Sequence, residues 1–349
     1  MRVLVTGHNG YIGSVLVPLL LEAGHEVTGV DSNLYDGDCA FGAVQPALVP
    51  SFDMDVRDAG PELLANIDAV VHLAAVCNDP IGNLHPECTY EINHRATVRL
   101  ARLAKAAGVP RFLQSSSCSI YGSAGDELLT EEAEFQPVTA YGESKVLVER
   151  DVAALADDGF SPVFLRNATA YGVSPRLRMD LVLNNLVGWA FTTGQVLVQS
   201  DGTPWRPIVH IEDISRAFIA LLEAPTEDVH NQAFNVGGTD ENYQVSQLAA
   251  MVEETVPGAR VEYAEGGGPD PRCYKVDFSK LQRTLPEFQL QWNAQKGMEE
   301  LYEAFQREGV SSEELFGPRY MRIKRVQGLM DLGSLGPDLR WKPAERLAS

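Results

Sequence analysis

Tyr141 and Lys145 are the residues of this sequence whose types and spacing most directly suggest chemistry. They are four residues apart in a segment with helical periodicity, which predicts that both side chains share one face of a helix. An ammonium group close to a phenol favours the phenolate, so the tyrosine can accept a proton from a hydroxyl group. Such pairs are common on helices, but here a predicted strand ending in Ser115-Ser116-Ser117 precedes the pair and supplies hydroxyl groups. We therefore expect Tyr141 to act as a base that Lys145 tunes.

A glycine-rich turn near the N-terminus indicates a site for a dinucleotide. The first predicted strand leads through Thr6-Gly7-His8-Asn9-Gly10-Tyr11-Ile12-Gly13 into an apolar helix. Glycines at this spacing permit a tight turn and a close approach of backbone N–H groups to a diphosphate. Asp31 closes the second strand, where its carboxylate can accept hydrogen bonds from ribose hydroxyls and would repel a 2′-phosphate. The pattern predicts NAD rather than NADP; a capping or turn aspartate is the alternative for Asp31.

The elements that must position these residues alternate between strands and helices. Apolar, β-rich runs occupy Arg2 to Thr6, Glu26 to Asp31, Ala69 to Ala75, Arg111 to Ser117 and Pro162 to Ala168. Segments with helical spacing lie between them, at Tyr11 to Ala23, Tyr90 to Ala107 and Tyr141 to Ala156. The alternation predicts an α/β fold with a Rossmann-type, doubly wound parallel sheet.

Beyond residue 168 the alternation becomes irregular, with Pro- and Gly-bearing connections at 174–175 and 201–204. We expect residues 1–168 to form an NAD-binding Rossmann domain. Residues 208–236 are expected to return to this domain, as a strand edge with a helix (Ile208 to Glu223) and a short strand (Ala233 to Val236). Residues 169–207 and 237–349 then form a smaller C-terminal substrate-binding α/β portion. The tail carries a basic cluster, which we expect to be a solvated helix face rather than a phosphate or partner site: Arg319, Arg322, Lys324 and Arg325.

Composition excludes several classes of protein. The formal net charge of -20 disfavours nucleic acid as a partner, although a small anionic substrate needs only a few local arginines. The five cysteines are scattered and form no Cys-x-x-Cys pair, so we expect free thiols and no bound metal. No signal peptide and no apolar run of membrane-spanning length is evident, so we expect a cytoplasmic protein with no membrane partner.

Motifs that follow one another in order make the chain resemble the extended short-chain dehydrogenases/reductases of the NAD-dependent nucleotide-sugar epimerase/dehydratase family. They are Thr6-Gly7-x-x-Gly10-x-x-Gly13, Asp31, Asp55-Val56-Arg57-Asp58, His72-Leu73-Ala74-Ala75, Asn93, Ser115 to Gly122, Tyr141-x-x-x-Lys145 and Trp205 to Asp213. The resemblance covers most of the chain and is more specific for the family than for the reaction. It implies NAD binding by Gly7, Gly10, Tyr11, Ile12, Gly13, Asp31, Asn33, Asp55, Val56, Leu73, Ala74, Ala75, Asn93, Ser115, Tyr141 and Lys145.

The same resemblance implies roles for the catalytic candidates. Tyr141 would start the oxidation of a sugar carbon, Lys145 would bind the nicotinamide ribose, and Ser117 would hold the substrate hydroxyl. The family's 4,6-dehydratases carry Thr-Asp-Glu where this chain has Ser117-Cys118-Ser119, so the usual acid and base of water elimination are missing. We therefore expect a nucleotide-sugar 4-epimerase that works through a transient 4-keto intermediate. Cys118 could instead donate or accept a proton in an atypical dehydratase or ketoreductase, or it could be a small buried filler.

A nucleotide-sugar substrate carries a diphosphate, which the planar fork of arginine suits. The resemblance implies pyrophosphate-binding arginines at Arg206 and Arg272, and a diphosphate-contacting asparagine at Asn184 or Asn185. Thr169 stands where relatives often have a sugar-binding asparagine. The expected substrate-binding set is Ser117, Ser119, Thr169, Asn184, Asn185, Arg206 and Arg272.

Two further implications concern assembly and regulation. Members of the family dimerise through two helices, which here would be about Asn93 to Ala107 and Tyr141 to Ala156, so the resemblance implies a homodimer. Outside enzymes, some related Rossmann proteins sense NAD(P) and regulate partners. The intact Tyr141, Lys145 and Ser117 argue against this alternative.

Overall fold

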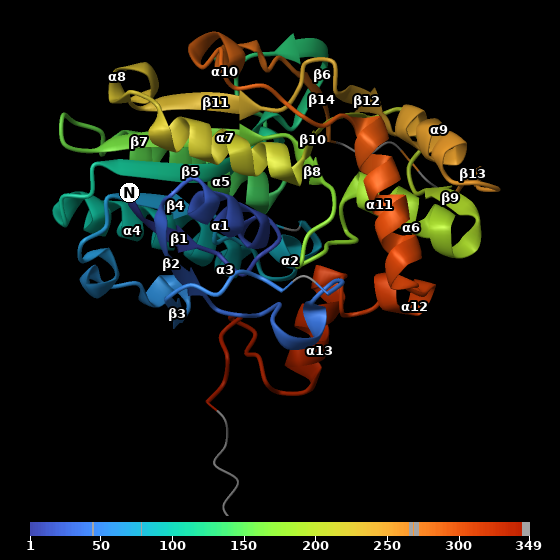
Figure 1. Ribbon diagram of the computed structural model, residues 1–349, viewed down its shortest axis with the longest axis horizontal. Coiled ribbons are helices and arrows are strands. Elements are labelled where there is room, and N and C mark those ends of the chain that lie inside the picture. The colour runs from blue at the N-terminus through green and yellow to red at the C-terminus, as the bar shows by residue number, and fades with distance from the viewer. Residues whose placement is uncertain (44, 78, 265–267, 269–271, 344–349) are drawn as a thin grey trace, which may run out of the picture.

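A seven-stranded parallel sheet forms the centre of the larger part of the molecule. The computed structural model describes residues 1–43, 45–77, 79–264, 268 and 272–343, and Figure 1 shows its ribbon. All neighbouring strands of the sheet are parallel. From one edge to the other the order is β3 (Ser51–Asp53), β2 (Glu26–Asp31), β1 (Arg2–Thr6), β4 (Ala69–His72), β5 (Arg111–Ser117), β7 (Ser161–Asn167) and β11 (Gln232–Val236).

Helices cover both faces of this sheet, which is why its inner strands are apolar runs rather than alternating ones. On one face, α1 (Gly13–Glu22) packs beside α7 (Ile211–Glu223), and both contribute side chains to a common apolar core with the strands. On the other face, α4 (Ala96–Ala106) and α5 (Ala140–Ala153) bury a second core. The Rossmann-type, doubly wound parallel sheet expected from the sequence is confirmed.

A smaller part has its own apolar core. It contains α6 (Val182–Thr193), α9 (Val245–Thr255) and α11 (Ala294–Glu308), packed with the parallel pair β9 (Gln195–Val198) and β13 (Arg260–Tyr263). A three-stranded sheet of β8 (Thr169–Tyr171), β10 (Trp205–His210) and β12 (Asn242–Gln244) and the pair β6 (Ser123–Leu129) with β14 (Cys273–Val276) complete the sheets. The other elements are η1 (Gly37–Cys39), η2 (Val56–Asp58), η3 (Pro61–Leu64), α2 (Asp79–Leu84), α3 (Pro86–Thr89), η4 (Tyr90–Arg95), η5 (Cys118–Tyr121), α8 (Thr226–Val229), α10 (Ser279–Thr284), α12 (Ser312–Leu315) and α13 (Arg322–Asp331).

The structure differs from the sequence expectations in three elements. The strand expected over Ala69 to Ala75 ends at His72, and the expected helix from Tyr90 begins with six residues of π-helix. The strand beginning near Ile208 does not join the large sheet, because β7 is already paired on both sides by β5 and β11. It pairs with β8 and β12 instead, while the helix that follows it, α7, contacts α1, β5 and β7.

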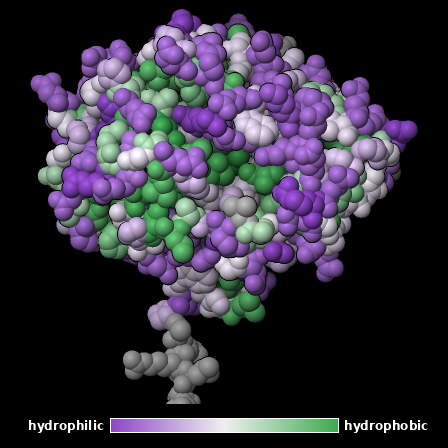
Figure 2. Space-filling view, in the orientation of Figure 1, coloured by the Kyte–Doolittle hydropathy of each residue, from purple (hydrophilic) through white to green (hydrophobic). Residues whose placement is uncertain are grey.

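On the face seen in Figure 2, hydrophilic side chains surround apolar ones that gather near the middle, as expected for a chain with a net charge of -20. Among the described residues, no helix combines the length and apolar character needed to cross a membrane.

Candidate active site

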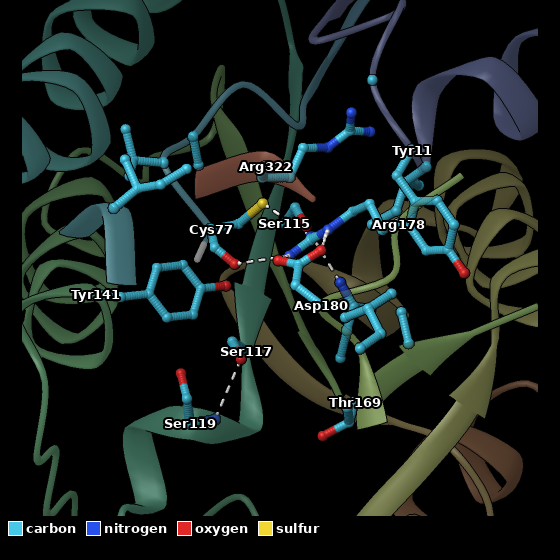
Figure 3. Close-up of a pocket in the computed structure, with 18 of the residues that line it drawn as sticks. Tyr11, Cys77, Ser115, Ser117, Ser119, Tyr141, Thr169, Arg178, Asp180 and Arg322 are labelled. Atoms are coloured by element: carbon cyan, nitrogen blue, oxygen red, sulfur yellow. Dashed lines mark hydrogen bonds and ion pairs between the residues drawn. The ribbon is translucent and has the colours of Figure 1, made fainter. Parts of the chain in front are cut away.

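A cavity of about 890 Å³ lies at the carboxyl ends of the strands, between the large sheet and the smaller part. This is the position where open parallel sheets place their ligands. Its walls contain the glycine-rich turn, the ends of β2, β4 and β5, and residues from α5, α6 and the C-terminal α13. Figure 3 shows Tyr141, Ser117, Ser119 and Thr169 around one part of this cavity, with Tyr11 and Arg322 on its other sides.

In the glycine-rich turn, the surrounding backbone leaves no room for a side chain at Gly7 or Gly13. Gly7 has a φ of +75°, and a Cβ atom added to it would lie 2.8 Å from the backbone nitrogen of Ala74. A Cβ atom on Gly13 would lie 2.2 Å from the carbonyl oxygen of Gly7, because α1 packs directly on the turn. Together with Gly10, Tyr11 and Ile12 these glycines line the cavity at the start of α1. The turn therefore fits the close approach of a dinucleotide diphosphate.

The Asp31 carboxylate ends β2 at the edge of the cavity. It accepts hydrogen bonds from the backbone N–H groups of Asn9 (3.0 Å) and Asn33 (2.9 Å), and burial raises its pKa. Asn33 adopts a φ of +52° and accepts a hydrogen bond from the Asn9 side chain, so it shapes this turn and does not itself line the cavity. Asp55 caps η2 and pairs with Arg57 at 2.6 Å, while Asp55 and Val56 both line the cavity.

The segment after β4 forms another wall of the same cavity. Leu73, Ala74 and Ala75, which follow the end of the strand at His72, line it. Asn93 lies behind this wall: its side chain accepts a hydrogen bond from the backbone N–H of Val76 (2.7 Å) and donates to the carbonyl of the same residue (2.9 Å). Asn93 therefore holds the wall in place, and it is absent from the described residues that line the cavity.

The Tyr141 and Lys145 pair projects from the first turns of α5. Thr139 begins this helix by accepting a hydrogen bond from the backbone N–H of Gly142. The Lys145 ammonium lies 5.6 Å from the centre of the Tyr141 ring and donates a 2.6 Å hydrogen bond to the carbonyl of Ser115. Burial lowers the pKa of Lys145 to about 8, with weaker opposing effects from Cys77 and Glu149. The side chains of the expected base and its tuning cation are thus close together in the cavity wall.

A buried ion pair connects the end of β5 with α5 and β7. Arg166 on β7 binds Glu149 on α5 at 2.7 Å, and both side chains are almost completely buried. Ser116 donates a short hydrogen bond to the same carboxylate. Because β5 and α5 are connected through this pair, the hydroxyls at the end of the strand keep a fixed position relative to the helix.

Ser117 at the end of β5 and the first two residues of η5 occupy different environments. Ser117 and Ser119 line the cavity, and the Ser117 hydroxyl accepts a hydrogen bond from the backbone N–H of Ser119. The Ser119 hydroxyl has no hydrogen-bond partner among the described residues, and Figure 3 shows it on the same side of the cavity as Ser117. Cys118 is only 1% exposed, its thiol contacts the carbonyl of Arg166 at 3.1 Å, and burial raises its pKa well above the ordinary value. The structure does not bring Cys118 together with the other catalytic candidates.

The two neighbouring asparagines of α6 are separated by the helix geometry. Asn184 is fully buried, and its amide contacts the backbone N–H of Gly172, the carbonyl of Arg178 and the Tyr11 hydroxyl. Asn185 lines the cavity and donates to the carbonyl of Met179. Asn184 is therefore a poor candidate for the substrate contact expected at this pair, because its polar atoms already have partners within the protein.

The remaining substrate candidates also line the cavity. Thr169 follows β7, and Arg206 and Arg272 come from β10 and from the segment before β14. Arg206 is almost completely buried and donates to the carbonyls of Trp205 (2.8 Å) and Arg272. Both arginines thus reach one wall of the cavity.

Several residues of the cavity were not expected from the sequence. Arg178 forms a 2.7 Å ion pair with Asp180 and donates to the sulfur and the carbonyl of Cys77, in the middle of the view in Figure 3. Tyr35 and Arg322 line the cavity as well. Arg322 is 3% exposed, so the expectation that the basic cluster of the tail is a solvated helix face is wrong for this residue. The Arg-Leu-Arg motif ahead of α6 offered a signal for Arg178, whereas no local pattern indicates Arg322.

Comparison with known proteins agrees with this geometry. Residues 3–237 match the model of the NAD dependent epimerase/dehydratase family. The UDP-glucose 4-epimerase of Corynebacterium glutamicum is 32% identical over 302 residues, which cover 82% of this chain and 90% of that protein. UDP-glucuronic acid decarboxylase 1 of Arabidopsis thaliana is 29% identical over 295 residues; the match covers 82% of this chain and 65% of the decarboxylase.

Among solved structures, MoeE5 in complex with UDP-glucuronic acid and NAD is similar to this chain. It has a TM-score of 0.76 and 29% sequence identity, and the match covers 88% of this chain and 99% of MoeE5. NAD is the cofactor, since the family is NAD-dependent and the glycine-rich turn and Asp31 fit it. The family match over two thirds of the chain, the Tyr141 and Lys145 geometry and the dinucleotide cradle lead to one conclusion: the chain belongs to the NAD-dependent epimerase/dehydratase family of extended short-chain dehydrogenases/reductases.

Proposed function

We propose that the protein is a nucleotide-sugar 4-epimerase, which inverts C4 of the sugar through a transient 4-keto intermediate. The observation that carries this proposal is the surroundings of Tyr141. The residues that line the cavity with it where β5 leads into η5 are Ser117 and Ser119, neither of which is a carboxylate, and the residue between them is a buried cysteine. The carboxylate of Asp180 does lie in the cavity, but it is already ion-paired with Arg178 at 2.7 Å. A base without a second acid suits an epimerase better than a dehydratase.

The side chains support the following steps. Tyr141 as phenolate accepts the proton of the C4 hydroxyl, and the nearby Lys145 ammonium stabilises the phenolate. Ser117 and Ser119 offer hydroxyls that hold the same sugar oxygen. NAD, when bound, accepts the hydride from C4 and returns it. After the keto sugar has turned its other face, Tyr141 returns the proton to the C4 oxygen, so that the proton balance closes within the site.

The two parts of the molecule would then bind different ligands. We propose that the segment 1–168, with the returning residues of 208–236, holds the cofactor and that the remainder holds the substrate. Arg206 and Arg272 would bind the diphosphate of the nucleotide sugar with their guanidinium groups. Asn185 and Thr169 would contribute further polar contacts. The Corynebacterium relative acts on UDP-glucose and MoeE5 binds UDP-glucuronic acid, which makes uridine nucleotides the first substrates to test.

Incubation of the purified protein with a panel of nucleotide sugars in deuterated water tests the reaction. We expect the C4 epimer to accumulate without deuterium on carbon, as NMR and mass spectrometry would show, because the hydrogen of C4 never exchanges with solvent. Loss of water, loss of carbon dioxide, or deuterium on a carbon next to the keto position would refute 4-epimerisation. The first two results would indicate the dehydratase or decarboxylase chemistry known among relatives.

Replacement of Tyr141 by phenylalanine tests the base. We expect turnover to fall by about 10²- to 10⁴-fold, the usual contribution of a positioned acid or base, while NAD binding is retained. Tyr90→Phe is the matched control, because the Tyr90 hydroxyl binds Glu143 outside the cavity and its removal should leave turnover unchanged. Full activity of Tyr141→Phe would contradict the proposal. Absence of turnover with every substrate, together with tight NAD binding, would favour the sensor alternative.

We also propose that the protein is a homodimer, formed through the segment of η4 and α4 together with α5, as in the family. Analytical ultracentrifugation across a concentration series measures this directly. A mass of 38.1 kDa at all concentrations would refute it.

A further inference from the structure

The last described part of the chain, residues 319–341, crosses the cofactor end of the cavity; we call it the C-terminal strap. It contacts the turns that follow three strands of the large sheet. Arg325 donates to the carbonyl of Leu34 and the Trp341 indole donates to the carbonyl of Ser32 (2.6 Å), both just after β2. Arg340 forms an ion pair with Asp58 in the turn after β3. The strap thus lies on the turns expected to bind the adenosine half of NAD.

Apolar contacts attach the strap to the wall beyond β4. Val326, Leu329, Leu335 and Leu339 of the strap form one buried cluster with Ile81 of α2. Tyr35 and Val76 pack against the same cluster. Figure 1 shows α13 below the large sheet and separate from α6 and α9. The strap is therefore a packed part of the cofactor end rather than a tail in solvent.

Arg322, in the first turn of α13, brings a positive charge into the cavity wall. Its guanidinium lies 3.9 Å from the centre of the Tyr35 ring and donates to the carbonyl of Arg176 (2.8 Å). Its Nη1 atom is buried and has no hydrogen-bond partner among the described residues, and no described carboxylate forms an ion pair with it. Burial lowers the pKa of Arg322, and repulsion by the buried Arg178 adds to this effect, while Tyr35 and the Asp180 carboxylate oppose it.

The unused N–H donor of the buried Arg322 guanidinium destabilises the folded protein unless an anion binds to it. A buried polar group without a partner destabilises the folded protein, and the effect is larger when the group is charged. The guanidinium fork provides paired N–H donors for phosphate oxygens. In Figure 3, Arg322 lies across the Arg178–Asp180 pair from Ser117, Ser119 and Thr169, which places it away from the sugar end and next to the turn that contains Tyr35.

We propose that Arg322 binds a diphosphate, specifically that of the dinucleotide, and that the C-terminal strap slows the release of NAD. The matched family model ends at residue 237, so neither the strap nor Arg322 belongs to the matched part of the chain. The proposal concerns cofactor binding alone and holds whichever reaction the enzyme catalyses.

The test compares Arg322→Gln with Lys324→Gln in the full chain freed of cofactor. Lys324 lies on the same helix but is exposed, and its replacement changes the net charge equally. NADH binding is followed by fluorescence and its release by stopped flow; UDP binding is followed by calorimetry. We expect Arg322→Gln to weaken NADH binding by roughly 10- to 100-fold, mainly through faster release, as for a charged hydrogen bond lost. The control variant and the affinity for UDP should change less than about threefold.

Two further measurements separate binding from a structural role. We expect the cofactor-free Arg322→Gln protein to be as stable as the wild type, because removal of the buried charge offsets the loss of the hydrogen bond to the Arg176 carbonyl and of the contact with Tyr35. Arg322→Lys should bind NADH with intermediate affinity, since lysine keeps the charge but not the fork. Unchanged NADH affinity, a loss of UDP affinity instead, or unfolding of the cofactor-free glutamine variant would each overturn the proposal. The last result would show that the empty fold itself depends on the arginine.

Discussion

Lys145 should destabilise the cofactor-free protein at neutral pH, and Lys145→Met should reveal this. The pKa of Lys145 is lowered from 10.5 to about 8, and each pKa unit corresponds to about 1.4 kcal/mol, so the buried charge costs roughly 3 kcal/mol at pH 7. Loss of the hydrogen bond to Ser115 offsets about 1 kcal/mol. The variant should thus gain about 2 kcal/mol, which at about 2.1 cal/mol/K per residue raises Tm by roughly 3 °C for 349 residues.

The lowered pKa of Lys145 determines the direction in which the stability of the folded protein changes with pH. Below pH 8 the lysine is protonated in both the folded and the unfolded protein, so the full cost is present. Between pH 8 and the unfolded value of 10.5 the folded protein releases the proton first, so the unfolded state binds more protons and the stability of the wild type rises. The advantage of Lys145→Met should therefore be complete at pH 7 and vanish as the pH approaches 10.5.

Differential scanning calorimetry or denaturant unfolding of both cofactor-free proteins from pH 7 to 10 measures the difference. Lys324→Met is the control, because Lys324 is exposed and the same replacement there should give no pH-dependent gain. A Lys145→Met protein that is less stable than the wild type at pH 7, or whose difference from it is the same at pH 7 and pH 10, would refute the reasoning. Turnover should be lost in either case, since the proposed chemistry needs the ammonium group.

Three further substitutions test the supports of the site. Gly13→Ala should abolish NAD binding, measured by calorimetry, because the new methyl group would collide with the Gly7 carbonyl 2.2 Å away; wild-type affinity would contradict the cradle geometry. Glu149→Gln should lower the free energy of unfolding, measured with urea, by about 3–5 kcal/mol, because it leaves the buried charge of Arg166 without its partner. A decrease below about 1 kcal/mol would show that the pair is unimportant for stability. Cys118→Ala should leave turnover nearly unchanged in the steady-state assay, whereas a large loss in a well-folded variant would give the thiol a chemical role.

Much of the cofactor site was predictable, because it depends on residues that are close in sequence. Local rules determine the geometry of the glycine-rich turn and of the Tyr141 and Lys145 pair, because each of them spans only a few residues. The same holds for Asp31, which ends a predicted strand. The separation of Asn184 from Asn185 was not predictable, because neighbouring helix positions differ by rotation and only the packing decides which one faces the cavity. The place of Arg322 was not predictable either, because it depends on how a segment more than 300 residues after the glycine-rich turn folds back to the same cavity.

The distribution of charge explains how so acidic a chain can bind ligands that carry diphosphates. A net charge of -20 repels anions at long range, but salt screens this repulsion over roughly 10 Å. Buried charges interact more strongly with a ligand than charges at the surface do. Arg178, Arg206 and Arg322 all line this cavity, and each is at most 8% exposed. We therefore expect the binding of anions to depend on these few buried guanidinium groups rather than on the overall charge.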